Sequence, residues 1–416
     1  MRISTNQFYN LNTQNILNRQ SDVNQSVLNI SEGKRVLTAS DDVVAATSIL
    51  NIKQEIALTE QYQSNITFAD SRIAVEETTL QTAEEVMFRV KDLVLQGNSV
   101  ANDDASRKAI ADELEARFEE MLSLANTRDE SGSYVFGGYQ NQSAPFEEQS
   151  DGSVIYHGDR GQRMTNVGPG VQVPTSDSGE KLFMSVSNSV GDFRPSYQLN
   201  AAHDEVERAI VTDVDITDRA SYVPAGNPDD YTIGFAAMPS GEMGVTVTDS
   251  LGAQVYPTPP QTQAPYVSGD TISFNGIETV IKKAPQDGDS ITLTPQTQVD
   301  TFSVIRDAID WLKSDNGVGV DEASRQLELG HIIGDIDEVQ KRLSNVRADI
   351  GARMQVTESQ SERHLDYTLT IEKSRSALED LDMVEAISAF ERQKLSLQAS
   401  QSAFSQVQGM SLLNYL

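Results

Sequence analysis

The carboxyl-terminal stretch of the chain has the apolar spacing of one long amphipathic helix. Asp382, with Glu385 three positions later, is typical of a helix N-cap. Apolar side chains then recur every seven residues, at Met383, Phe390, Leu397 and Phe404, and Val407 and Met410 continue the face. The positions between them carry mainly Ser and Gln. Because a weakly charged polar face costs little to bury, the pattern fits packing between subunits and an ordinary solvated face equally well.

The amino-terminal stretch repeats this pattern over roughly thirty residues, which again favours coiled-coil packing. The apolar positions are Tyr9, Ile16, Val23, Ile30 and Leu37, with Asn, Gln and Ser between them. Gly33 is predicted to close this helix, and Ser40, Asp41 or Asp42 to cap the next one.

Three further helices are predicted from the same periodicity. Apolar positions between 66 and 94 hold the seven-residue spacing, and a helix at about 105–126 places Ile110, Leu114 and Phe118 on one face. The clearest seam comprises Leu329, Ile332, Ile336, Val339, Leu343, Val346 and Ile350. We expect it to continue past Gly351 through Leu365, Leu369 and Ile371 towards the last helix. The two halves of the chain should then lie antiparallel, with both termini at one end.

Residues 171–300 have a β pattern. Segments 231–235, 244–248, 271–274 and 290–294 alternate or are β-branched, and turn sequences such as Asn275-Gly276 separate them. Acidic residues far outnumber basic ones here. The predicted fold is mainly α with an inserted β domain, an α+β multidomain protein built on a long antiparallel helical bundle. Its predicted parts are a terminal coiled-coil segment (1–42 with 376–416), a helical bundle (43–170 with 301–375) and the acidic β domain (171–300).

Composition excludes several function classes. A formal net charge of −30 argues against binding nucleic acid or an anionic membrane surface. No apolar run approaches the roughly 18 residues of a membrane span, and the first residues lack the apolar core of a conventional signal peptide. This pattern fits a cytoplasmic protein or one exported by a dedicated route. With no cysteine, disulfides, thiolate metal sites and thiol nucleophiles are excluded.

No constellation of residues predicts an enzyme, a metal site or a cofactor site. His157, His203, His331 and His364 are scattered, and His331 with Asp335 one turn away offers too few ligands for a metal. Residues 213–218 resemble a calcium loop only faintly, because Asp218 and Pro224 stand where Gly and Glu are required, so we expect a solvated acidic loop. Gly137-Gly138 lacks the Lys and the spacing of a phosphate loop and predicts a turn.

Several of these segments resemble the flagellin family. Gly33-Lys34-Arg35-Val36 followed by Ser40-Asp41-Asp42 is similar to its amino-terminal signature, with Val43 where the family commonly has Pro. Residues 131–139 with Pro145-Phe146, and residues 345–353, match as well. Within the family, residues 1–5, 382–386 and 412–416 resemble the branch of hook-associated proteins that forms the hook–filament junction. The resemblance covers roughly the first 150 and the last 120 residues and is silent on the β insert.

The resemblance implies a structural role in the bacterial flagellum. The protein would be secreted through the flagellar type III apparatus and would form a ring of subunits. That ring would join the hook, through hook-associated protein 1, to the flagellin filament. A cytoplasmic export chaperone would bind the carboxyl-terminal helix.

The residues themselves suggest how assembly proceeds. Terminal helices with sparse apolar positions are weak in isolation, so we predict that they are disordered in the monomer and fold on packing against neighbouring subunits. The predicted assembly interface comprises Tyr9, Ile16, Val23 and Ile30 with Met383, Phe390, Leu397, Phe404 and Val407.

Three other functions remain open at this stage. One is a flagellin-type filament subunit, which would grow long filaments on a seed where an adaptor would stop at a short layer. Another is a cytoplasmic coiled-coil scaffold or signalling protein, which periodicity alone would allow. The last is a surface-binding module that uses the β insert as an adhesin or carbohydrate binder.

Overall fold

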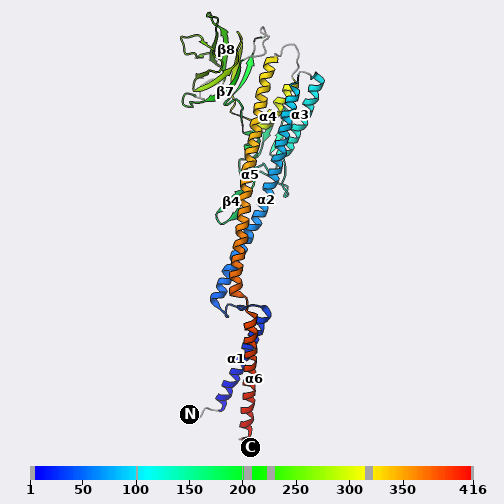
Figure 1. Ribbon diagram of the computed structural model, residues 1–416, viewed down its shortest axis with the longest axis vertical. Coiled ribbons are helices and arrows are strands. Elements are labelled where there is room, and N and C mark those ends of the chain that lie inside the picture. The colour runs from blue at the N-terminus through cyan, green and yellow to red at the C-terminus, as the bar shows by residue number, and fades with distance from the viewer. Residues whose placement is uncertain are drawn as a thin grey trace. The chain divides into compact units, whose positions relative to one another are not determined.

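The computed structural model describes residues 5–99, 102–198, 200, 209–222, 230–313 and 322–413 of the chain (Figure 1). The chain divides into two compact units. The terminal unit comprises Met1–Ile66, Val167–Gly170 and Glu358–Leu416, and the body comprises Thr67–Asn166 and Val171–Thr357.

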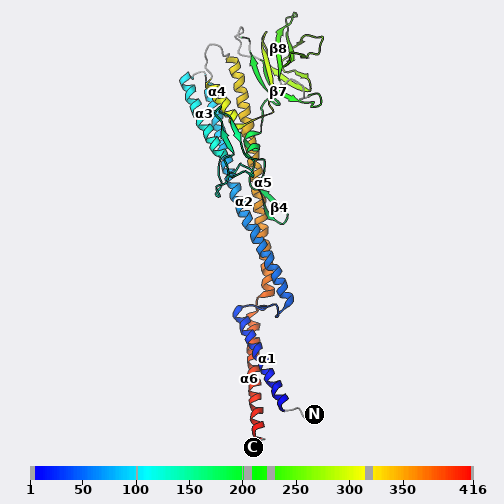
Figure 2. The same ribbon diagram turned by 180° about the vertical axis from the view of Figure 1, so that it is seen from behind.

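The terminal unit contains both ends of the chain. Helices α1 (Thr5–Glu32) and α6 (Met383–Leu413) lie side by side and antiparallel, so that both ends of the chain lie at the same end of this unit (Figures 1 and 2). The predicted N-cap of α6 is present, because Asp382 Oδ1 accepts hydrogen bonds from the backbone N–H groups of Val384 (2.9 Å) and Glu385 (3.1 Å). The start of α2 (Val43–Gly97), the end of α5 (Glu322–Glu379) and the short segment Val167–Gly170 complete this unit.

The body is built on the remaining parts of α2 and α5, with α3 (Asp104–Ala125) and α4 (Thr301–Lys313). All seven residues of the predicted seam from Leu329 to Ile350 are buried, as are Ile73, Leu80, Met87 and Val94 on α2. The seven-residue spacing therefore predicted the core of the body correctly. Arg347 joins the two long helices through Glu77, with Nη2 and Oε1 2.7 Å apart.

The continuation of this seam was predicted wrongly. Leu365 and Leu369 are 61% and 53% exposed, whereas Thr357, Gln360 and His364 are buried. The spacing of seven from Ile350 is kept, but it falls on Thr357 and His364, so the seam turns polar. His364 shows how these groups are satisfied, because its Nε2 is 2.7 Å from the carbonyl oxygen of Val167 and its ring stacks on Tyr62.

The β insert contains two antiparallel sheets around one core. The larger sheet has the order β10-β9-β8-β14-β6, with β11 beside β9, and the smaller has the order β12-β13-β7. Their bounds are β6 (Phe193–Gln198), β7 (Ile210–Ile216), β8 (Tyr231–Ala237), β9 (Met243–Asp249), β10 (Gln254–Tyr256), β11 (Ala264–Pro265), β12 (Thr271–Phe274), β13 (Ile277–Lys282) and β14 (Ser290–Pro295). The turn predicted at Asn275-Gly276 joins β12 to β13, and both residues have positive φ angles (45° and 77°), as a tight hairpin requires.

Short strands also flank this insert. They are β1 (Phe146–Glu148), β2 (Val154–Tyr156), β3 (Met164–Gly168), β4 (Val171–Pro174), β5 (Val186–Ser187) and β15 (Gln298–Val299). A single π-helical turn, η1 (Glu180–Met184), precedes β5. The pairs β1–β2 and β5–β15 are antiparallel.

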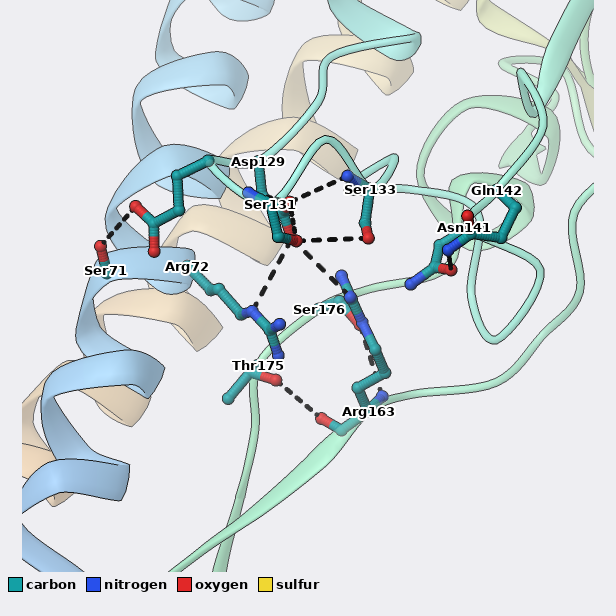
Figure 3. A network of polar contacts seen from close by, with 11 residues as sticks. Ser71, Arg72, Asp129, Ser131, Ser133, Asn141, Gln142, Arg163, Thr175 and Ser176 are labelled. Atoms are coloured by element: carbon teal, nitrogen blue, oxygen red, sulfur yellow. Dashed lines mark hydrogen bonds and ion pairs between the residues drawn. The ribbon is translucent and has the colours of Figure 1, made fainter.

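A buried carboxylate organises the loop that follows α3 (Figure 3). Asp129 Oδ1 accepts the backbone N–H groups of Ser131 (2.9 Å) and Ser133 (3.0 Å) and the Ser131 hydroxyl. Its Oδ2 is 3.7 Å from Arg72 Nε on α2 and 3.8 Å from Arg163 Nη1. Burial alone would raise the pKa of Asp129, but these hydrogen bonds and Arg72 together hold it below its usual value. The negative charge of Asp129 therefore holds the loop against α2 through its ion pair with Arg72.

A second buried carboxyl lies on α2. Glu76 Oε1 accepts the backbone N–H of Asp177 (2.9 Å), and the Asp177 carboxylate in turn pairs with Arg353 of α5 at 2.7 Å. Burial, and then the neighbouring Asp177 charge, raise the pKa of Glu76 to about 8. Glu76 is therefore mainly neutral at pH 7, at a point where α2, α5 and the segment before η1 meet.

Candidate assembly interface

The facing sides of α1 and α6 carry the predicted interface residues. Tyr9 and Phe404 pack edge to face with ring centroids 5.2 Å apart, and Ser26 Oγ donates a hydrogen bond to Gln393 Oε1 (2.6 Å). The residues that are half-buried in this seam are Tyr9, Ile16, Val23, Ile30, Phe390, Leu397 and Phe404. Met383 remains 42% exposed, and the side chain of Val407 lies outside the described residues.

This seam is incompletely packed. One solvent-open groove of about 390 Å³ lies between Val27 and Ile30 of α1 and Ile387 and Phe390 of α6. Another of about 350 Å³ is lined by residues on both helices, including Ile16 and Phe404. Apolar residues that line such open grooves stay partly in contact with water, so they gain less from burial and from van der Waals contact than residues of a closed core.

Each of these helices also has a second apolar stripe that nothing in the described chain covers. Leu17 and Leu28 of α1 are 60% and 54% exposed, and Val384 and Leu395 of α6 are 79% and 62% exposed. Within each pair the residues are eleven positions apart, which is three helical turns, so they share one face. Exposed apolar residues aligned in this way are typical of protein–protein contact surfaces. The geometry is that of helices made to pack on more than one neighbour.

Exposed apolar residues also lie on the parts of α2 and α5 that belong to the terminal unit. Leu50 and Leu58 on α2 are exposed, as are Leu365 and Leu369 on α5. The two leucines that were wrongly assigned to the internal seam thus belong to the exposed apolar residues of the unit. The apolar pattern in the sequence did signal packing, but it could not distinguish an internal surface from one open to other chains.

The other residues considered in the sequence have local structural roles. Residues 213–216, expected to form an acidic loop, lie in strand β7, where Val214 is buried. That expectation was wrong because alternation of Asp with Val and Ile is itself a strand pattern. Gly138 has a positive φ of 68°, and Asp159 Oδ1 accepts the backbone N–H of the following Tyr139 (3.1 Å). This is a turn closed by a carboxylate, as the sequence predicted a turn.

His331 and Asp335 line a cavity of about 340 Å³ in the body that the sequence did not reveal. His331 Nε2 is 2.8 Å from the Tyr197 hydroxyl, and Asp335 Oδ1 accepts the backbone N–H of Ser189 (2.9 Å). Burial lowers the pKa of His331 to about 4. Both side chains are thus engaged with β6 and the segment before it. In the part of the chain that the structure describes, no three His, Asp or Glu side chains converge on a metal-sized site, and His203 lies outside that part.

Among the helices that the structure describes, none combines the length and apolarity needed to cross a membrane.

Comparison with known families identifies the class of protein. Residues 3–141 match the bacterial flagellin N-terminal helical region, and residues 333–416 match the bacterial flagellin C-terminal helical region. Together the two regions cover more than half of the chain. The chain belongs to the flagellin family, whose fold is that of structural flagellar proteins, with helical termini around a central β-rich region.

Individual relatives narrow this class. Flagellar hook-associated protein 3 of Salmonella typhimurium is 31% identical over 190 residues, which is 45% of this chain and 59% of the relative. The match thus spans about six tenths of the relative's length. Polar flagellin C of Vibrio parahaemolyticus is 22% identical over 336 residues, 80% of this chain and 85% of the relative.

A solved structure covers more of the fold. The flagellar hook-associated protein 3 of Legionella pneumophila superposes with a TM-score of 0.68 at 29% identity. The superposition covers 79% of this chain and 98% of that one.

Proposed function

We propose that this chain is a structural subunit of the bacterial flagellum that joins the hook to the flagellin filament. Three relatives support this role: the hook-associated protein 3 of Salmonella typhimurium, the Legionella pneumophila structure of that name, and a second Legionella pneumophila structure described as a flagellar junction protein. The observation that carries the proposal is the α1–α6 pair, with its open seam and second apolar stripes. Such helices suit a subunit whose final packing comes from its neighbours.

In this proposal the subunit forms a ring with copies of itself at the hook–filament junction outside the cell. Hook-associated protein 1 would be its neighbour on the hook side and flagellin its neighbour on the filament side. An export chaperone would hold the α6 helix before type III export. The protein would have no nucleic acid, membrane or cofactor partner and no catalytic role.

The mechanism we propose couples folding of the termini to assembly. Helices α1 and α6 have weakly charged polar faces and bury only one incomplete stripe against each other. The free energy gained from this burial is small compared with the cost of ordering roughly sixty residues, since the lost conformational entropy costs about 1 to 2 kcal/mol for each residue. Packing of Leu17, Leu28, Val384 and Leu395 against neighbouring chains would supply the missing burial. Tyr9, Ile16, Val23 and Ile30 would then face Phe390, Leu397 and Phe404 in an ordered pair.

A second candidate is a flagellin-type filament subunit, favoured by the match to Polar flagellin C over most of the chain. A third, weaker candidate is a coiled-coil scaffold protein that stays inside the cell. The three differ in what loss of the gene does. Loss of an adaptor leaves flagellin without the layer on which it adds, so unassembled flagellin is released into the medium. Loss of a flagellin leaves no such subunit to release, and loss of a scaffold leaves filament attachment unchanged.

Seeded growth separates the first two candidates directly. Purified chain is added to isolated hooks that carry hook-associated protein 1, and the added length is measured by electron microscopy. The proposal expects growth to stop after a short layer that then accepts flagellin. Continued elongation into long filaments by this chain alone would instead identify it as a filament subunit.

A further inference from the structure

The two connecting segments of the terminal unit are bonded to each other. Residues 33–42 link α1 to α2, and residues 380–382 link α5 to α6. The Arg35 backbone N–H donates to the Glu379 carbonyl oxygen (2.8 Å), and the Leu381 N–H donates to the Gly33 carbonyl oxygen (3.0 Å). These bonds form an isolated antiparallel β-bridge, in which Lys34 is paired with Asp380. Two segments that are far apart in the sequence are thereby fixed at one point.

The Glu379 side chain concentrates charge at this point. Its carboxylate lies 2.8 Å from Lys34 Nζ, 3.3 Å from Lys53 Nζ and 3.7 Å from Arg375 Nε, although the side chain is only 7% exposed. Lys34 follows α1, Lys53 lies on α2 and Arg375 on α5. The hydrogen bond from Lys34 lowers the pKa of Glu379, so the group is ionised at neutral pH. Removing this charge would take away the one carboxylate that Lys34, Lys53 and Arg375 share, and with it the ion pairs that join residue 34, α2 and α5.

A small core and two carboxylate caps order the rest of this region. Val36, Ala45 and Ile49 are buried together, with Leu378 packed against them. The Asp41 carboxylate accepts the backbone N–H groups of Leu37 (3.0 Å) and Thr38 (2.8 Å). The Asp42 carboxylate accepts that of Ala45 (2.9 Å) at the start of α2. Gln25 of α1 also donates a hydrogen bond to Asp41 Oδ1 (3.4 Å). The core contacts and the two backbone caps themselves lie within residues 36–49 and at Leu378, outside the α1–α6 seam.

We propose that residues 33–53 and 375–381 form a clasp, locked by the Glu379 carboxylate, that stays folded in the monomer and marks where assembly-coupled folding of α1 and α6 ends. The clasp holds the starting points of both terminal segments together. Each segment then meets the other at the high effective concentration of a tethered pair, in the register set by the Gly33–Leu381 bond. Glu379 is therefore a positioning residue for the terminal helices. The part of this inference that concerns α1 and α6 rests on the proposed function.

Amide hydrogen exchange of the full-length monomer, followed by mass spectrometry of overlapping peptides, tests the clasp. The expected result is slow exchange at Arg35 and Leu381, whose N–H groups are bonded across the clasp, and fast exchange along α1 and α6. Glu379→Gln removes the charge at nearly constant shape and is expected to speed exchange at both amides at least tenfold. The matched control is Glu391→Gln, which removes an exposed carboxylate paired with Lys394 on α6. It should leave both amides unchanged.

The outcomes separate the clasp from the proposed function. Exchange at Arg35 and Leu381 as fast as along α1 would overturn the clasp. Unchanged protection in the Glu379→Gln variant, with the thermal unfolding of the body also unchanged, would overturn the role of the carboxylate. A third outcome is that α1 and α6 exchange slowly in the monomer while Glu379→Gln still speeds exchange at both amides. The clasp and the role of Glu379 would then be supported, and assembly-coupled folding of α1 and α6 would be contradicted.

Discussion

The chain contains two seams with the same apolar periodicity and different degrees of closure. In the body, the seven apolar seam residues of α5, the first of which is Leu329 and the last Ile350, are at most 5% exposed. In the terminal unit, the apolar residues of the α1–α6 seam are half-buried beside solvent-open grooves, and each helix has a second apolar stripe that is exposed. A heptad repeat therefore specifies a face for packing, and the number of surrounding elements decides whether that face is closed within one chain. The body has enough elements, and the terminal pair lacks them.

The largest expected effect is at the closed seam. Leu343→Ala leaves a cavity in a fully buried site and is expected to lower the free energy of unfolding by about 4 kcal/mol. Chemical denaturation followed by circular dichroism measures this change. Leu395→Ala on α6 is the matched control, since the same truncation at a 62% exposed leucine should change monomer stability little. Equal losses for the two variants would remove the distinction between the seams.

A second prediction concerns the buried carboxyl beside the closed seam. The pKa of Glu76 in the folded state, about 8, lies above that of an exposed glutamate, so the folded state binds the proton more tightly than the unfolded state. This contribution is fully present below pH 4.5 and is lost as the pH rises towards 8. Between pH 5 and pH 8 the wild-type chain should lose on the order of 3 kcal/mol relative to Glu76→Gln.

Denaturation of both proteins across this pH range measures the difference. Parallel stability profiles for Glu76→Gln and the wild type would show that Glu76 is not held neutral. The Glu77→Gln variant is a useful neighbour, because Glu77 pairs with Arg347 and its loss should not produce the same pH dependence.

A smaller effect is expected where the internal seam turns polar. His364→Leu removes the hydrogen bond to the Val167 carbonyl oxygen and leaves that buried acceptor unsatisfied, at a cost of about 2 kcal/mol. Thermal unfolding of the monomer would detect the loss. Arg363→Leu, which replaces an exposed residue next to it, serves as the control. If His364→Leu stabilises the chain instead, an apolar seam would be preferred there and the polar contacts would carry no stability.

The sequence allowed much of this architecture to be predicted, for identifiable reasons. Seven-residue spacing located the α5 seam, the α2 core and the terminal helices, and alternation located the central strands of the β insert. It missed the polar continuation at Thr357 and His364, because polar residues carry no signal in an apolar pattern. It also missed the buried Glu76 and the clasp at Glu379. Burial of a single glutamate depends on segments distant in the chain, and no local pattern records those contacts.

The candidate interface could likewise be predicted from the sequence only in part. The pairing of Tyr9 with Phe404 follows from antiparallel helices and regular spacing, both visible in the sequence. The exposed stripes are Leu17 with Leu28 on α1 and Val384 with Leu395 on α6. Their eleven-residue spacing does not stand out among the heptads and becomes evident only once burial is known. Its role in assembly remains a prediction.

Leu397→Asp tests the central claim most directly, because it places a charge in the open seam. The expected cost to the monomer is under about 1 kcal/mol, since the terminal helices contribute little to folding before assembly. The measurement pairs denaturation of the monomer with its addition to hooks carrying hook-associated protein 1. The account predicts an unchanged unfolding midpoint together with complete loss of addition. A large drop in monomer stability, or normal addition by the variant, would contradict it.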